Sequence, residues 1–139
     1  MALKQAKAAF NEDEVPVGAV LVKDGDLIDS AYNLSKAKNN PLFHTEMILI
    51  NRAFENDQIH SLKGFELYVT LEPCPMCAGA IVASGISKVV FGAYDFDYGG
   101  FGGFVNLKQH PFARNLEIYG GILESECSEL LRNFFKERR

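Results

Sequence analysis

Apolar and polar positions at the amino-terminal end predict a helix followed by a pair of strands. Apolar residues recur at helical spacing over residues 2–12, and Pro16 cannot continue that helix. The valine-rich run at residues 17–22 and the apolar pair at residues 27–28 predict two strands. An Asp-Gly step between them is typical of a hairpin turn, so the two strands should pair antiparallel.

The rest of the chain alternates between helical and strand patterns. A polar loop at residues 34–41 precedes a helix expected at residues 45–55, with Met47, Ile50 and Phe54 facing inward. Strands are expected at residues 65–71, 87–91 and 116–119, helices at residues 75–84 and 123–138, and a glycine-rich loop up to residue 103. This alternation predicts an α/β domain with a mixed sheet, in which the later strands run largely parallel through helical crossovers.

Length and composition are those of an ordinary globular protein. At 139 residues the chain has about the size of one domain, so residues 1–139 are expected to form a single domain. Its 47% hydrophobic and 23% charged residues exclude disordered and fibrous classes. No apolar run approaches the about 20 residues that cross a bilayer, and the amino terminus lacks the apolar core of a secretory signal. We therefore expect a cytoplasmic protein without a membrane segment.

The charge balance excludes a broad electrostatic attraction to nucleic acid. Fourteen basic against eighteen acidic side chains give a net charge of −4. The dense basic stretch is at the carboxyl end, where Arg132, Lys136, Arg138 and Arg139 stand beside one acid, Glu137. This tail is either a local RNA-binding edge or a solvated helix end, with its cations at the negative pole of the helix dipole.

The cysteines point to metal or catalytic chemistry. Three cysteines in a cytosolic context do not suit a disulfide framework. Cys74 and Cys77 lie three positions apart at a predicted helix start, where both sulfurs can reach one ion. Alone, such a pair could equally be a redox couple or two packed thiols. His44, at the start of the preceding helix, adds a third ligand and favours zinc with water in the fourth position.

Other residues with possible chemistry receive plainer interpretations. His60 and His110 are expected to be surface or hydrogen-bonding histidines, and Cys127 a small buried residue of the last helix. The glycine-rich run at residues 99–103 is not a dinucleotide fingerprint, because Val105 stands where the third glycine belongs. No nucleotide cofactor is expected.

The order of the candidate ligands resembles a known signature. His44-x-Glu46 followed by Pro73-Cys74-x-x-Cys77 resembles the signature of zinc-dependent nucleobase deaminases. Longer stretches are similar to bacterial tRNA-specific adenosine deaminases, namely EVPVGAV at residues 14–20, LEPCPMCAGA at 71–80, VFGA at 90–93 with Asp95, and the closing Phe134-Phe135 with its trailing basic residues. Tyr94 and Phe96 beside Asp95 are less typical of that family. The resemblance runs from near residue 1 to residue 139.

The resemblance implies a fold and a reaction. The fold would be cytidine deaminase-like, with three layers and a mixed five-stranded sheet flanked by helices. The reaction would be hydrolysis of adenosine to inosine at the wobble position of a tRNA anticodon, with release of ammonia. His44, Cys74 and Cys77 would hold one zinc ion per subunit and lower the pKa of its bound water. Glu46 would move protons between this water and the base. The partners would be the anticodon stem-loop and a second copy of the chain in a homodimer.

The same resemblance implies contacts to the flipped nucleotide. Asn33 would contact the base edge or the ribose, and Val17 would pack against the base. Ala93 and Asp95 would line the entrance. Thr45, which stands where the family usually has alanine, would offer its backbone amide to the base.

The last helix carries a predicted contact to RNA. Leu130, Leu131, Phe134 and Phe135 recur at helical spacing, so most of this stripe should pack on the sheet. Adjacent residues of a helix point about 100° apart, so the two phenylalanines cannot be equally buried. Phe135 is expected to stack on an anticodon-loop base, with the neighbouring basic residues near phosphates.

Two alternative functions remain at this point. One is a deaminase of free nucleosides or bases, such as cytidine, adenosine or guanine, which would share the zinc core. The other is a non-catalytic zinc module, in which the metal supports folding and Glu46 merely caps its helix.

Overall fold

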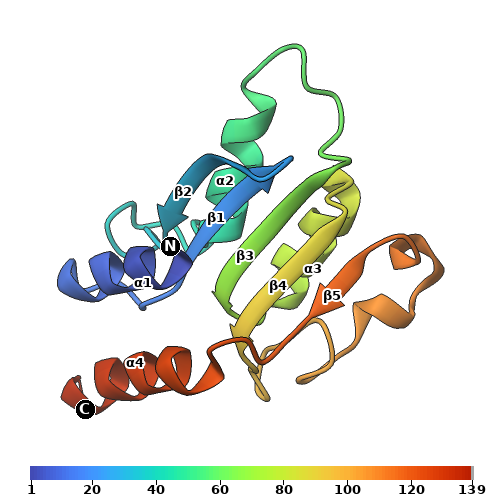
Figure 1. The fold of residues 1–139 in the computed structure, drawn as a ribbon. Coiled ribbons are helices and arrows are strands. Elements are labelled where there is room, and N and C mark those ends of the chain that lie inside the picture. Colours follow the sequence, from blue (N-terminus) through green and yellow to red (C-terminus); the bar gives the residue numbers. More distant parts are fainter. Residues whose placement is uncertain (139) are drawn as a thin grey trace.

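A five-stranded sheet lies between two pairs of helices (Figure 1). The computed structural model describes residues 1–138, so Arg139 of the predicted basic tail lies outside the described residues. The helices are α1 (Ala2–Asn11), α2 (Thr45–Phe54), α3 (Pro75–Ser84) and α4 (Glu124–Glu137), and two 3₁₀ turns span Leu107–Gln109 and Pro111–Ala113. The strands are β1 (Gly18–Lys23), β2 (Asp26–Tyr32), β3 (Phe65–Leu71), β4 (Lys88–Ala93) and β5 (Glu117–Tyr119). Within the described residues, no helix combines the length and the apolar character that crossing a membrane requires.

The sheet is mixed, as the sequence predicts. Its strand order is β2-β1-β3-β4-β5. β1 pairs antiparallel with β2 and β3, while β3, β4 and β5 run parallel. α3 makes the crossover from β3 to β4, since parallel neighbours cannot be joined by a tight turn. As a result, the carboxyl ends of β2, β3, β4 and β5 all lie on the same side of the sheet (Figure 1).

The helices form the outer layers of a three-layer fold. α2 and α3 cover one face of the sheet, and α1 and α4 lie on the other (Figure 1). The main core is between the sheet and α2 with α3. Leu21, Leu67 and Val89 of the strands meet Leu49 and Ile81 of the helices there, and none of these side chains is exposed. This packing fixes the first turns of α2 and α3 beside the strand ends.

Two details of the predicted elements differ from the structure. Met47 is only half-buried, and the inward face of α2 is formed by Ile48, Leu49 and their neighbours. β2 is longer than its apolar pair, and Leu27 and Ile28 are 46% and 50% exposed. The sheet edge explains the second difference, because an edge strand can leave apolar side chains in solvent and continue with polar ones.

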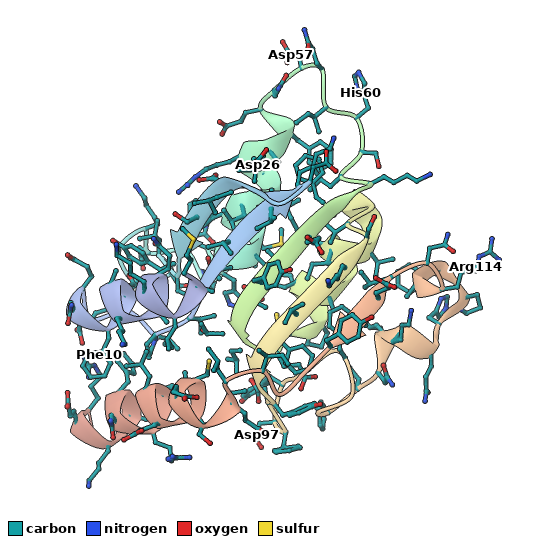
Figure 2. All side chains as sticks on the ribbon, in the orientation of Figure 1. Phe10, Asp26, Asp57, His60, Asp97 and Arg114 are labelled. Atoms are coloured by element: carbon teal, nitrogen blue, oxygen red, sulfur yellow. The ribbon has the colours of Figure 1, made fainter. Side chains whose placement is uncertain are left out.

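α4 packs beside α1 and against β4. Phe134 is buried, whereas Phe135 is 50% exposed. The Phe134 ring meets the Phe10 ring edge-on, with centroids 5.8 Å apart, and Figure 2 shows Phe10 between the two helices. Arg138 lies over the Phe134 ring at 3.7 Å and pairs with Asp13 at 2.6 Å. The guanidinium of Arg138 is thus engaged with Asp13 and Phe134, and its predicted contact to RNA stays a prediction.

Candidate metal centre and active site

Two helix starts meet at the edge of the sheet and present the candidate ligands. His44 is the N-cap of α2 and Cys74 is the N-cap of α3, both with extended backbone. Pro75 follows at the first position of α3, where its missing N–H costs nothing. Neither N-cap side chain caps its own helix. Both side chains are thus available to the site between the helices.

The distances within this cluster fit a zinc ion. His44 Nδ1 lies 3.6 Å from Cys74 Sγ and 3.6 Å from Cys77 Sγ. The three ligand atoms lie within 4.8 Å of one another. Zn–S bonds of about 2.3 Å and Zn–N bonds of about 2.0 Å at tetrahedral angles bring sulfur and nitrogen to about 3.5 Å from each other. Three protein ligands would leave the fourth tetrahedral position open, as in catalytic zinc sites.

The protonation of the cluster favours a cation. A hydrogen bond from the Cys77 thiol, followed by one from His44, lowers the pKa of Cys74 to about 4. The pKa of Cys77 is raised far above its ordinary value, because its proton is shared with Cys74 and its side chain is buried. The hydrogen bond to Cys74 also raises the pKa of His44. Negative charge therefore concentrates on one sulfur that faces the other two donors.

Glu46 stands in the first turn of α2, two residues after His44, and is 4% exposed. Burial, the largest cause, raises its pKa to about 7. A carboxyl group that is half protonated near neutral pH can both accept and donate a proton, which is the requirement for a general acid and base. The geometry thus provides a proton carrier beside a candidate metal centre.

A cavity of about 320 Å³ opens over these residues, at the small end of the range usual for ligand sites. It is lined by residues from the segment before β1, the ends of β2, β3 and β4, and the starts of α2 and α3: Val15, Val17, Asn33, Ser35, His44, Glu46, Leu71, Glu72, Cys74, Pro75, Asp95 and Tyr98. Aliphatic side chains form one part of the wall, and most of the other lining residues bring polar groups to it. Apolar surface to pack against a ring, with polar groups to fix its orientation, suits a flat, partly polar ligand.

The predicted substrate residues fall into two groups. Val17, Asn33 and Asp95 line the cavity. Ala93 is 2% exposed and Thr45 is fully buried, and neither lines the cavity. The Thr45 amide, expected to contact a base, donates instead to Asn33 Oδ1 at 2.8 Å. In the structure this amide therefore orients Asn33, and the Asn33 side chain is the group that faces the cavity.

One predicted residue lies away from the cavity, and two residues that were not predicted line it. Phe135 lies on α4 and does not line the cavity. Ser35 and Tyr98 do line it, although no pattern in the sequence indicates either residue. Each belongs to an irregular loop without hydrophobic period, so only the tertiary structure shows that it borders the site. Their polar or aromatic character in a loop near a motif residue was the only available hint.

Comparison with known proteins agrees with this site. The model of the cytidine and deoxycytidylate deaminase zinc-binding region matches residues 1–93, which include all three candidate ligands. The chain belongs to this deaminase family. Within the family, it is 47% identical over 139 residues to the tRNA-specific adenosine deaminase of Bacillus subtilis, covering 99% of this chain and 86% of the relative. It is 42% identical to that of Aquifex aeolicus, covering 100% of this chain and 92% of the relative.

Solved structures of deaminases are similar to the structure of this chain. A structure from a study of A-to-I editing by tRNA:A34 deaminases at the wobble position superposes with a TM-score of 0.87 at 40% identity, covering 94% of this chain and 95% of that one. A guanine deaminase from Nitrosomonas europaea has a TM-score of 0.81 at 23% identity, covering 96% and 80%, and shares the fold. The cytidine deaminase-like fold and the resemblance to tRNA-specific adenosine deaminases are confirmed.

Proposed function

We propose that the protein deaminates adenosine to inosine at the wobble position of a tRNA anticodon, as a single catalytic domain. The observation that carries the proposal is the buried Glu46 beside a donor set that fits zinc, both at one cavity. The names of the similar full-length relatives support tRNA as the substrate.

Each residue of the site has a part in this reaction. His44 Nδ1 and the sulfurs of Cys74 and Cys77 would hold zinc, which lowers the pKa of a bound water toward neutrality. Glu46 accepts a proton from the attacking water and delivers it to the ring nitrogen N1. It then carries the second proton to the departing amino group. Water and adenosine thereby become inosine and ammonia, with no other reactant.

The cavity wall recognises the base. Asn33, held by the Thr45 amide, presents its side-chain amide to the edge of the base or the ribose. Val17 packs against the ring, and Asp95 stands at the entrance. A wobble adenosine is unpaired in its loop, so only unstacking is needed before it enters.

The remaining partners are proposed from charge and exposure. The exposed Phe135 stacks on an anticodon-loop base, and the exposed Arg132 and Lys136 face phosphates. Two chains form a homodimer, and the enzyme works in the cytoplasm, where tRNA is its substrate.

The deciding experiment is sequencing of tRNA for wobble inosine after incubation with the pure protein. We expect inosine at the wobble position with the parent protein and none with Glu46→Ala. Ammonia released from free adenosine, cytidine or guanine, without inosine in tRNA, would instead indicate a deaminase of free nucleosides or bases. Bound zinc without any deamination would indicate a non-catalytic zinc module.

A further inference from the structure

The loop that follows β4 borders the cavity, and the part of it nearest the cavity is exposed. The loop covers residues 95–103, and Asp97 marks it at the lower edge of the molecule in Figure 2. The Phe101 side chain anchors the far part of the loop, since it is 7% exposed and belongs to the core. Asp95 and Tyr98 line the cavity, yet Tyr98 is 71% exposed and buries too little surface to fix this part of the loop. Contacts made by the loop backbone must therefore help to hold it.

The Pro73 carbonyl accepts one such contact from the Gly100 N–H, and one buried carboxylate provides three more. Glu72 lies between the end of β3 and the start of α3 and is 2% exposed. Its Oε1 accepts a hydrogen bond from the Asp95 N–H at 3.1 Å. Its Oε2 accepts from the N–H groups of Phe101 and Gly103, each at 2.9 Å. All three donors belong to the loop, so the carboxylate fastens the beginning and the end of the loop to the same point.

Two glycines allow the backbone to close around this carboxylate. A Cβ atom at Gly99 would lie 2.2 Å from Glu72 Oε2, and one at Gly103 would lie 2.4 Å from Glu72 Oε1. Neither distance is possible for a real side chain. We call Glu72 with Asp95, Gly99, Phe101 and Gly103 the Glu72 clasp. The clasp explains two glycines that no nucleotide-binding fingerprint requires.

We propose that Glu72 is a positioning residue of the deaminase, which holds Asp95 and Tyr98 at the cavity mouth through the Glu72 clasp. The proposal rests on the proposed function, because it assumes that a nucleotide enters this cavity. A buried carboxylate is costly to leave without hydrogen bonds, so the three N–H donors are held firmly. The loop is thereby ordered before RNA arrives, and the entropy of ordering it is not lost on binding. Glu72 itself touches none of the reacting atoms.

The test variant is Glu72→Gln in the full chain. It keeps the shape of the side chain, but one carboxylate oxygen becomes an NH₂ group, which cannot accept a hydrogen bond from the loop N–H that it faces. We expect backbone hydrogen exchange at residues 95–103 to become at least about tenfold faster, while exchange in α2 and α3 stays the same. For an anticodon stem-loop RNA, we expect KM to rise about tenfold and kcat to change less than about twofold, with zinc content unchanged. A residue that only stabilised the fold would not separate KM from kcat in this way.

A matched control is available on the other side of the cavity. The buried Glu14 carboxylate accepts the N–H groups of Lys36 and Ala37 in the loop after β2. Glu14→Gln is the same chemical change, and it should speed exchange at residues 36–37 and leave residues 95–103 as in the parent. If Glu72→Gln fails to fold, Gly103→Ala disturbs the same carboxylate from the loop side.

A double-mutant cycle tests whether Glu72 acts through the loop. In a protein that already carries Asp95→Ala and Tyr98→Ala, Glu72→Gln should change KM less than about twofold, because the groups it positions are gone. Unchanged exchange at residues 95–103, loss of zinc, or an undiminished KM effect in that background would overturn the proposal. Absence of RNA deamination by the parent would refute the proposed function instead, and hydrogen exchange would still test the clasp.

Discussion

The cavity has two sides that are fixed in different ways. On the metal side, His44, Glu46 and Cys74 stand on the first turns of α2 and α3, which a shared core holds in place. On the rim, the loops at residues 35–37 and 95–103 have no regular structure, and each is fastened to a buried carboxylate, Glu14 or Glu72.

The difference predicts how each side fails. The metal side depends on a few groups that must all be present, so one substitution should abolish its function. The rim depends on loop order, so substitutions there should change binding by modest factors. Cys77→Ala and Glu46→Ala test the metal side, and Glu72→Gln tests the rim. Substitutions in α4 and at Thr45 should have smaller effects than those on the metal side.

The largest effect should follow loss of a ligand. We expect Cys77→Ala to lower zinc from about one ion per chain to less than about a tenth, because two protein ligands bind zinc too weakly. Activity should disappear, and the unfolding temperature should fall to that of the chelator-treated parent. Metal analysis and thermal unfolding measure these changes. Cys127→Ala is the control, since Cys127 lies in α4 and should keep zinc unchanged. Full zinc occupancy in Cys77→Ala would refute the ligand assignment.

The second largest effect should follow removal of the proton carrier, Glu46. We expect Glu46→Ala to lower the single-turnover rate by a factor of at least about 100, the usual contribution of a general acid or base. Zinc should be retained because Glu46 is not one of the three candidate ligands, and the unfolding temperature should change little, because burial opposes the charged form of this carboxyl group. Glu55→Gln, at the exposed end of α2, is the control and should match the parent. A Glu46→Ala protein as fast as the parent would exclude the proton-transfer role.

The two phenylalanines of α4 should separate binding from stability. Phe135→Ala should weaken binding of an anticodon stem-loop about tenfold, the value of one stacked base, and leave the free energy of unfolding within about 0.5 kcal/mol. Phe134→Ala should instead lower the free energy of unfolding by about 3 kcal/mol, because its ring is buried against Phe10. RNA titration and urea unfolding measure the pair. Equal effects of both variants on unfolding would contradict the assignment of the exposed ring to RNA.

The smallest effect concerns Thr45, beside the metal side. Within residues 1–138, its buried hydroxyl has no hydrogen-bond partner, which costs free energy. Thr45→Val keeps the shape and the amide that holds Asn33, so the free energy of unfolding should rise by about 1 kcal/mol. Urea unfolding with zinc analysis measures it. A less stable variant would show that the hydroxyl has a partner in solution, such as an ordered water.

The sequence predicted the metal side well because its determinants are local. The spacing of Cys74 and Cys77 and the position of Pro75 at a helix start lie within one short segment. The mixed sheet was also predicted, because the helical and strand patterns that alternate along the chain are likewise each contained in a short segment. Placing His44 beside the cysteines needed one further step, the expectation that two helix starts meet at one sheet edge.

The rim could not be predicted in this way. The bond from Gly103 to Glu72 joins residues 31 positions apart, and the bond from Lys36 to Glu14 joins residues 22 apart. An acid next to a motif has no periodicity that shows it is buried, and Tyr98 has none that shows it lines a cavity. The contact of Arg138 with α1 was missed for a related reason, since its ion pair with Asp13 joins residues near opposite ends of the chain.

The buried carboxylates also change how the protein meets a polyanion. Of the 18 acidic side chains, Glu14, Glu46 and Glu72 lie inside the fold, where backbone N–H groups or burial offset their charge. The surface that an approaching RNA encounters therefore carries fewer carboxylates than the count of 18 suggests, so its basic residues face fewer acidic neighbours. With a net charge of only −4, long-range repulsion is weak, and association should depend little on electrostatic steering. Its rate would be set mainly by the time that the anticodon loop needs to find the correct orientation at the cavity mouth.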